Sequence, residues 1–210
     1  MVGRGIYALP AAGVLTAVPW VLFLGNPSAK DDPEGYARGV ASAVHTVGVY
    51  LYLLGLIFLL FGLLALYAYL ARTPTSSWAG TAVIASVVGI ALALPSFGIT
   101  MMGDAVLADV YLGGERDLSA AMGLLSDPTL TYRTSANFGV WVIASVIGAI
   151  AYAVAAWRSG SVPRWAGVLV AIGFGLSMTL SPGLAWPGGL CLVIGGVWLA
   201  RSVSQAPSAG

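Results

Sequence analysis

The residue of this chain that is best suited to chemistry is His45, the only histidine among its 210 residues. A neutral imidazole is the commonest metal ligand in proteins, and it titrates near neutral pH. A single histidine cannot supply both axial ligands of a bis-histidine haem, whereas Met101 or Met102 could complete a His/Met haem or copper site. The alternative is a histidine at the membrane–water interface that hydrogen-bonds a neighbour or water. We therefore assign no metal ligand and leave any cofactor unknown.

Asp31, Asp32 and Glu34 come nearest to the paired acidic motif of an enzyme that uses divalent metal ions. The order Asp32-Pro33-Glu34 is also typical of a helix start, with an N-cap, a proline in the first position and an acid in the first turn. Capping and solvation therefore explain this group. The single Cys191 excludes an intramolecular disulfide and a cysteine-only metal site. No HExxH, GxSxG, Walker or dinucleotide-binding motif occurs, so we assign no catalytic residue.

A second set of polar side chains lies toward one end of the expected membrane spans. Together with His45 these residues form the candidate ligand-binding set: Thr46, Ser96, Thr100, Asn137, Ser177 and Thr179. They would line a shallow vestibule that opens to the outside and suits a small apolar molecule or a lipid. The alternative is that Ser and Thr serve helix packing here, as Ala and Gly do.

These candidates have to be positioned by membrane helices, because the composition is that of a membrane protein. The chain is 59% hydrophobic and 8% charged, whereas a soluble domain has about 25% charged residues. The segment 47–71 has no charge, and it exceeds the roughly 20 apolar residues that cross a bilayer. The net charge of +1 gives no argument for nucleic acid. We therefore expect a lipid bilayer as the surroundings and no nucleic-acid partner.

Six apolar segments predict six transmembrane helices in one domain over residues 1–202, with a polar, disordered tail at 203–210. The expected spans are residues 6–24, 47–71, 78–102, 138–157, 162–180 and 184–200. A helix that starts at Pro33 has no clear stop before the second span ends, so it must protrude, tilt or break near Gly48. The connection 103–137 is expected as an outer loop with two short amphipathic helices, 104–112 and 117–126. These helices would cover the bundle or simply pack against it.

The charged residues divide between the two sides that six spans define. One side carries five arginines and no acid, and the other carries four basic residues and all eight Asp and Glu. The positive-inside rule places the first side in the cytoplasm by this small excess, and the segregation of the acids supports the helix count. We therefore predict both termini in the cytoplasm. Eight arginines with one lysine, beside many Ala, Gly and Val, suggest a bacterial coding sequence and thus a multi-pass protein of the bacterial plasma membrane.

Two predicted hairpins have similar sequences, LYAYLARTPTSSWAG at 66–80 and AYAVAAWRSGSVPRWAG at 151–167. In each, Tyr-Ala ends one helix, an arginine follows and Trp-Ala-Gly opens the next helix. This pattern favours a parallel repeat of helices 2–3 and 4–5, because both hairpins face the same way. The alternative is that arginine and aromatic residues gather at any cytoplasmic membrane interface.

No Asp, Glu, Lys or Arg lies in the interior of an expected span, which argues against a proton or sodium relay. The small-residue pairs Ala85/Gly89 and Ala144/Gly148 allow close helix contact or the docking of a partner. The leading prediction is a non-enzymatic accessory subunit or scaffold of a membrane complex, with a membrane-protein partner or a second copy of itself. The second prediction is a binder or carrier of a small apolar molecule or lipid through the outer vestibule. An intramembrane enzyme ranks last, because no acid–base pair is visible.

The turn before the fifth span reads Pro163-Arg164-Trp165-Ala166-Gly167. With the six-span pattern and the charge-segregated loops, it resembles the six-helix bacterial integral membrane proteins that are grouped as domains of unknown function. Those proteins often show a Pro-Arg-Trp-x-Gly turn before their fifth helix. The resemblance covers the helix pattern over most of the chain and rests on this one motif. It implies a six-helix fold and no activity, and no functional residue is carried across.

Overall fold

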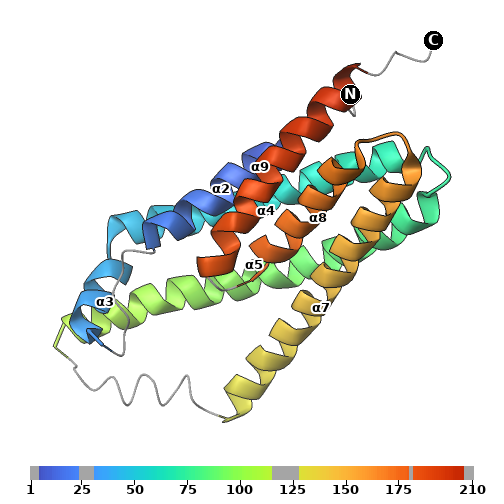
Figure 1. Cartoon of the computed structure of the whole chain (residues 1–210). Helices are drawn as coiled ribbons and strands as arrows, with labels where there is room; N and C mark the ends of the chain where they lie inside the picture. The colour runs from blue at the N-terminus through green and yellow to red at the C-terminus, as the bar shows by residue number, and fades with distance from the viewer. Residues whose placement is uncertain (1–4, 24–30, 115–127, 180–181, 206–210) are drawn as a thin grey trace.

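The computed structural model describes residues 5–23, 31–114, 128–179 and 182–205, and every regular element in these ranges is an α-helix (Figure 1). At residues 33, 99–102, 128–138 and 182 it describes the backbone alone. The helices are α2 (Ala8–Phe23), α3 (Pro33–Val40), α4 (Ala43–Leu70), α5 (Ser76–Leu112), α7 (Pro128–Ser159), α8 (Arg164–Ser177) and α9 (Pro182–Gln205). The predicted all-α class is therefore confirmed.

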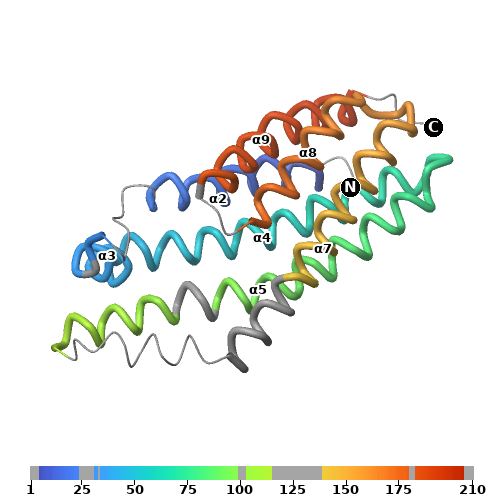
Figure 2. Tube along the Cα trace, turned by 60° about the horizontal axis from the view of Figure 1, so that its bottom comes forward, coloured from blue at the N-terminus to red at the C-terminus, as the bar shows by residue number. Residues whose placement is uncertain are grey.

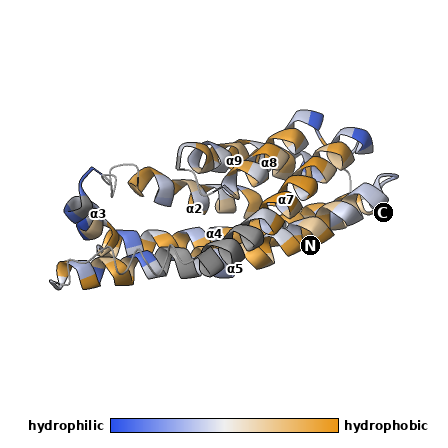
Figure 3. Cartoon of the chain, turned by 90° about the horizontal axis from the view of Figure 1, so that it is seen from below, coloured by the Kyte–Doolittle hydropathy of each residue, from blue (hydrophilic) through white to orange (hydrophobic). Residues whose placement is uncertain are grey.

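Four of these helices are long and apolar enough to cross a membrane: α4, α5, Gly139–Ser159 of α7 and Gly183–Gln205 of α9. The helices α2 and α8 are apolar but have only 16 and 14 residues. That length is about 24 and 21 Å, against a hydrocarbon core of about 30 Å. Figure 3 shows mainly hydrophobic stretches between hydrophilic residues at the two ends. The structure fits a helical membrane protein, and the count of six spans stays a prediction.

The six longer helices form a closed ring. Each of α2, α4, α5, α7, α8 and α9 contacts the next, and α9 returns to contact α2. Two buried tyrosines tie the ring across its middle: Tyr152 on α7 donates to the Leu63 carbonyl on α4 at 2.8 Å, and Tyr52 on α4 donates to the Ser177 carbonyl on α8 at 2.6 Å. In Figures 1 and 2 the beginning of α2 and the end of α9 lie at the end that also holds the α4–α5 and α7–α8 turns. We call this the turn end, and the opposite one the α3 end.

The long second helix breaks at Ala41 and Ser42, about two turns before the expected break at Gly48. Asp32 caps α3 as expected, because its Oδ1 accepts from the backbone N–H of Gly35 at 2.9 Å. Ser42 then caps α4, where its Oγ accepts from the backbone N–H of His45 at 3.2 Å and donates to a carbonyl of α3 at 2.6 Å. The serine satisfies both helix ends at the junction, so the chain bends there.

The connection after the third expected span is shorter than expected, because α5 continues through residues 104–112. This piece is the last part of a 37-residue helix rather than a separate one, since it contains no proline or other helix breaker. The fourth long helix begins at Pro128, a favoured first helical residue, ten residues before the expected start. The second expected piece, 117–126, lies outside the described residues. The whole of α5 is about 55 Å long, so part of it extends beyond the roughly 30 Å of hydrocarbon.

Glycines at seven-residue spacing allow α4 to approach α2 closely. Gly48, Gly55 and Gly62 lie along one face of α4, and a Cβ at each position would come within 2.6–2.7 Å of atoms of α2. Real Cβ atoms do not approach so closely, so the contact depends on the missing side chain. Seven residues are nearly two turns, and the stripe therefore runs almost along the helix axis and favours near-parallel packing of the two helices.

Two glycine pairs on α9 allow close packing against two neighbouring helices, α2 and α8. Gly189 and Gly196 face α2, whereas Gly188 and Gly195 face α8. A Cβ at any of the four would lie 2.6–2.9 Å from the neighbouring helix. The pairs are again seven residues apart, so both contacts run along the length of α9. This helix is therefore fitted between α2 and α8, which closes the ring.

Gly89 and Gly148, which were expected to allow helix contact or docking, lie in the contact between α5 and α7. A Cβ on Gly89 of α5 would collide with the Oγ of Ser145 on α7, and a Cβ on Gly148 of α7 would lie 2.5 Å from the Oγ of Ser86 on α5. The contact is reciprocal, because each helix offers a serine to the glycine of the other. Of the two alternatives, internal helix contact is the one observed, and Gly89 and Gly148 are not available to a partner.

The two similar hairpins place equivalent residues in unlike surroundings. Tyr152 is 1% exposed and bonds across the ring, whereas Tyr67 is half-buried. A Cβ on Gly167 would collide with Ala156 of α7, whereas a Cβ on Gly80 would meet nothing within 4 Å. These differences do not support equivalent packing of the two hairpins, and the repeat stays a prediction from sequence.

Candidate functional site

His45 lies in the first turn of α4, and its side chain is buried at the α3 end. Its imidazole packs against the ring of Phe23 on α2, with ring centroids 4.7 Å apart and planes inclined by 33°. Asp104 of α5 interacts electrostatically with His45, and Tyr36 of α3 interacts with Asp104. We call Phe23, Tyr36, His45 and Asp104 the His45 cluster.

Local structure explains why these residues meet. The Ser42 cap fixes where α4 begins and so places His45 in its first turn. The continuation of α5 brings Asp104 to the same level, seven residues after the buried Phe97 and therefore on the same helix face. Buried apolar residues hold α3 against this part of α5: Ala37, Val40 and Ala108. The cluster is thus built by four consecutive helices, α2 to α5, and Asp104 is the one member that comes from far along the sequence.

The electrostatics of the His45 cluster centre on Asp104, which lies beyond the expected span 78–102. Partial burial raises the pKa of its carboxyl, because a carboxylate loses hydration there, and His45 acts in the opposite direction as a neighbouring cation. Burial and the charge of Asp104 both raise the pKa of the Tyr36 phenol. The cluster therefore combines a carboxyl that holds its proton more tightly than in water, an imidazole and a protonated phenol. Such a set can hydrogen-bond a polar group of a bound molecule.

A row of aromatic rings leads from the His45 cluster into the bundle. Phe23 contacts Trp20 at 5.8 Å between ring centroids, and Trp20 contacts Tyr52 at 5.7 Å. Tyr52 then contacts Phe97 at 4.9 Å, and Phe97 contacts Trp141 at 5.3 Å. The spacings and the inclined planes are typical of favourable aromatic pairs. The row crosses α2, α4, α5 and α7, so apolar rings border the His45 cluster on the side of Phe23.

The hydroxyls of the predicted set donate mainly to their own helices. Thr46, Ser96 and Thr179 each donate to a main-chain carbonyl three or four residues earlier, at 3.4, 2.9 and 2.8 Å respectively. Ser177 is fully buried at the end of α8, where its carbonyl accepts from Tyr52. Serine and threonine commonly make such bonds in membrane helices. These contacts favour the helix-packing alternative, and the vestibule stays a prediction.

Two members of the predicted set cannot be placed in this way. The side chains of Thr100 and Asn137 lie outside the described part of the structure, and their backbones belong to α5 and α7. The side chains of Met101 and Met102 are also outside it, so the His/Met alternative for His45 stays open. Within the ranges that the structure describes, no three His, Cys, Asp or Glu side chains come together where they could hold a metal ion.

Sequence reasoning identified His45 but missed its two polar neighbours. Asp104 is the first residue of the expected loop helix 104–112, and Tyr36 is not among the predicted site residues. The signal that could have found Asp104 is its seven-residue spacing from Phe97, which puts both on one face if the helix continues. No comparable signal was available for Tyr36, because its position depends on how α3 folds back onto α5.

No protein-family model, curated protein or solved structure matches this chain. The fold and the site define a class: an all-α protein with four helices able to cross a membrane and a polar, partly buried cluster at one end. The likeness to six-helix bacterial membrane proteins stays a prediction.

Proposed function

We propose that this chain is a non-enzymatic integral membrane protein that serves as an accessory subunit or scaffold of a membrane complex and docks through its α3 end. The observation that supports this is the packing of α3 on the last part of α5, through a small buried cluster of its own. We call residues 31–40, which contain α3, and residues 103–114, which contain the end of α5, the platform. Gly89 and Gly148 are not part of the proposed docking surface, because they pack inside the chain.

The platform has properties that suit recognition by a second protein. Part of the platform is the end of α5, a helix longer than the bilayer core, so this part extends toward water. Its exposed acids are Asp31, Asp32, Glu34 and Asp109, of which only Glu34 has an ion pair among the described contacts, with Arg38. The four acids outnumber Arg38, the one exposed base of the platform, and a surface with a net charge steers and orients a partner of the opposite charge. The partner that fits is therefore a membrane protein with a basic surface at the same level.

The experiment is native mass spectrometry of the full chain, extracted gently from its own membrane. The Asp109→Lys variant reverses one exposed charge on the platform, and Arg201→Asp reverses one exposed charge at the turn end as a matched control. We expect added protein mass on the wild type and on Arg201→Asp, and its loss from Asp109→Lys. A bare wild-type monomer, a dimer of this chain alone, or equal retention in both variants would overturn the proposal.

The second candidate function is a binder or carrier of a small apolar molecule or lipid. The observation that favours it is the His45 cluster, where polar groups lie beside a row of buried aromatic rings. The same mass measurement would then show an added mass of a few hundred daltons. We expect Asp104→Asn to lose this mass and Asp109→Asn, five residues further along the same helix, to keep it. Retention in both variants would exclude the cluster as the binding site.

The orientation of the chain in the membrane is supported by the exposed arginines that lie at the turn end of the bundle. The turn end carries the exposed arginines Arg72, Arg158, Arg164 and Arg201. By the positive-inside rule we propose that this end faces the cytoplasm of a bacterial cell. The platform then lies on the outer side of the plasma membrane. Cysteine placed at Ser204 should then resist a membrane-impermeant thiol reagent on intact cells, and cysteine at Asp109 should react. The reverse pattern would refute this orientation.

A further inference from the structure

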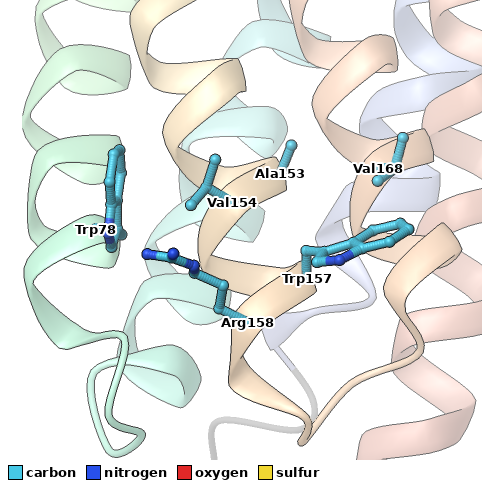
Figure 4. A pocket seen from close by; sticks show the side chains of 6 residues that line it. All are labelled: Trp78, Ala153, Val154, Trp157, Arg158 and Val168. Atoms are coloured by element: carbon cyan, nitrogen blue, oxygen red, sulfur yellow. The ribbon is translucent and has the colours of Figure 1, made fainter.

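A groove lies at the turn end between α5, α7 and α8. It has a volume of about 480 Å³ and is lined by Trp78, Ala153, Val154, Trp157, Arg158 and Val168. In Figure 4 the guanidinium of Arg158 points across the groove toward Trp78. The small apolar side chains lie farther from the turns than Arg158 does. The groove is therefore charged near the end of the bundle and apolar along its length.

Aromatic rings and a second arginine surround the charged part of this groove. Trp78, Trp157 and Trp165 are 41%, 42% and 63% exposed, which is unusual for tryptophan in a soluble protein but typical of the headgroup level of a membrane. Arg164 lies over the ring of Trp157 at 5.5 Å, and Trp165 meets that ring edge-on at 5.5 Å. These tryptophans favour a position of the groove's mouth at the level of the lipid phosphates.

The charge near the groove is positive, and the sequence provides no acid to balance it. The turns 71–75 and 159–163 and the helix residues beside them contain Arg72, Arg158 and Arg164 and no Asp or Glu. Arg158 is exposed and lines the groove rather than pointing away from it. A planar guanidinium matches the geometry of a phosphate, and basic pockets between membrane helices are known to bind acidic lipid headgroups.

We propose that this groove binds one acidic phospholipid, with its phosphate on Arg158 and an acyl chain along Ala153, Val154 and Val168. Trp78 and Trp157 flank the glycerol region on either side. The proposal requires only that the chain lies in a membrane, and it is independent of the partner at the platform, which is at the opposite end. The occupant is an intact lipid rather than a free phosphate, because most of the lining is apolar.

The test uses the full chain in lipid nanodiscs that contain equal amounts of phosphatidylglycerol and phosphatidylcholine with the same acyl chains. Native mass spectrometry after detergent release measures the ratio of the two lipids that stay bound. We expect the wild type to retain phosphatidylglycerol preferentially and Arg158→Gln to lose this preference by about fivefold, the effect of one basic residue near a membrane surface. Arg201→Gln, exposed at the same end but outside the groove, should keep it.

Two further measurements make the result decisive. The thermal unfolding midpoint of Arg158→Gln should equal that of the wild type, because the side chain is exposed and a surface substitution changes stability little. Excess soluble glycerol phosphate should not displace the bound lipid. Equal retention of both lipids by the wild type, an unchanged ratio in Arg158→Gln, or displacement by glycerol phosphate would overturn the proposal.

Discussion

Gly167→Ala should destabilise the bundle, whereas the same substitution at Gly80 should stabilise it. Each glycine is the third residue of a Trp-Ala-Gly sequence near the beginning of a helix, α8 and α5 respectively. A Cβ on Gly167 would collide with the Cβ of Ala156 on α7, whereas a Cβ on Gly80 would meet nothing within 4 Å. The two substitutions share their chemistry and sequence context, so their difference isolates the packing contribution.

The expected magnitudes follow from two opposing effects. Alanine in place of a helical glycine stabilises by about 0.5–1 kcal/mol, and an extra carbon forced into a packed contact costs about 1–3 kcal/mol. The net effect at Gly167 is a loss of up to roughly 2.5 kcal/mol. In a chain of 210 residues, 1 kcal/mol shifts the unfolding midpoint by about 2–4 °C. We therefore expect a fall of up to roughly 10 °C for Gly167→Ala and a rise of roughly 1–4 °C for Gly80→Ala.

The assay is thermal unfolding in detergent micelles, followed by tryptophan fluorescence at one fixed heating rate because membrane proteins often unfold irreversibly. A double variant, Ala156→Gly with Gly167→Ala, exchanges the small residue between the two helices. It should be less destabilised than the sum of its single changes, because the two positions are in contact. A rise of the midpoint in Gly167→Ala equal to that in Gly80→Ala would refute the reasoning.

Three further substitutions test other contacts. Tyr152→Phe removes the bond to the Leu63 carbonyl and should cost about 1 kcal/mol, measured as a fall of about 2–4 °C in the unfolding midpoint. Ser42→Ala removes the cap at His45 and should cost about 1 kcal/mol, with faster amide hydrogen exchange confined to the first turn of α4. Asp104→Asn should make stability less dependent on pH. A raised pKa means that the contribution of Asp104 is present at low pH and lost as the pH rises from its ordinary value of 3.8 through the raised one. The measurement is the unfolding midpoint of the wild type and of Asp104→Asn across this pH range. An equal loss of stability in both proteins as the pH rises would contradict the reasoning.

The sequence was sufficient to locate the apolar part of each of the six longer helices and one of the caps, but not where every helix ends. The uncharged run 47–71 became most of α4, and Asp32 caps α3 as its neighbours Pro33 and Glu34 indicated. The length of α5 was not predictable in this way. Gly103 and Asp104 looked like a helix end, but no helix breaker follows them, and the continuing helix is also held by its packing on α3. Local signals describe one helix at a time, whereas this boundary depends on two.

The candidate site was only partly predictable for the same reason. A lone histidine can be recognised in any sequence, and His45 is indeed buried beside other polar groups. Its neighbours come from three other helices, so their identity follows from packing. The seven-residue spacing of Gly48, Gly55 and Gly62 is visible in the sequence, but the helix they face is not. Three of the hydroxyls predicted to bind a ligand donate instead to main-chain carbonyls three or four residues earlier in the chain.

The contact between α2 and α9 places a condition on how the protein is made. The ribosome delivers α2 first and α9 last, yet Gly189 and Gly196 fit the last helix against the first. Until α9 has been inserted, α2 has its glycine-fitted neighbour on one side only. The newly made chain therefore completes this contact only after α9 has been inserted. A chain that is cut short before α9 leaves one face of α2 open, and this distinguishes it from the finished protein in the same membrane.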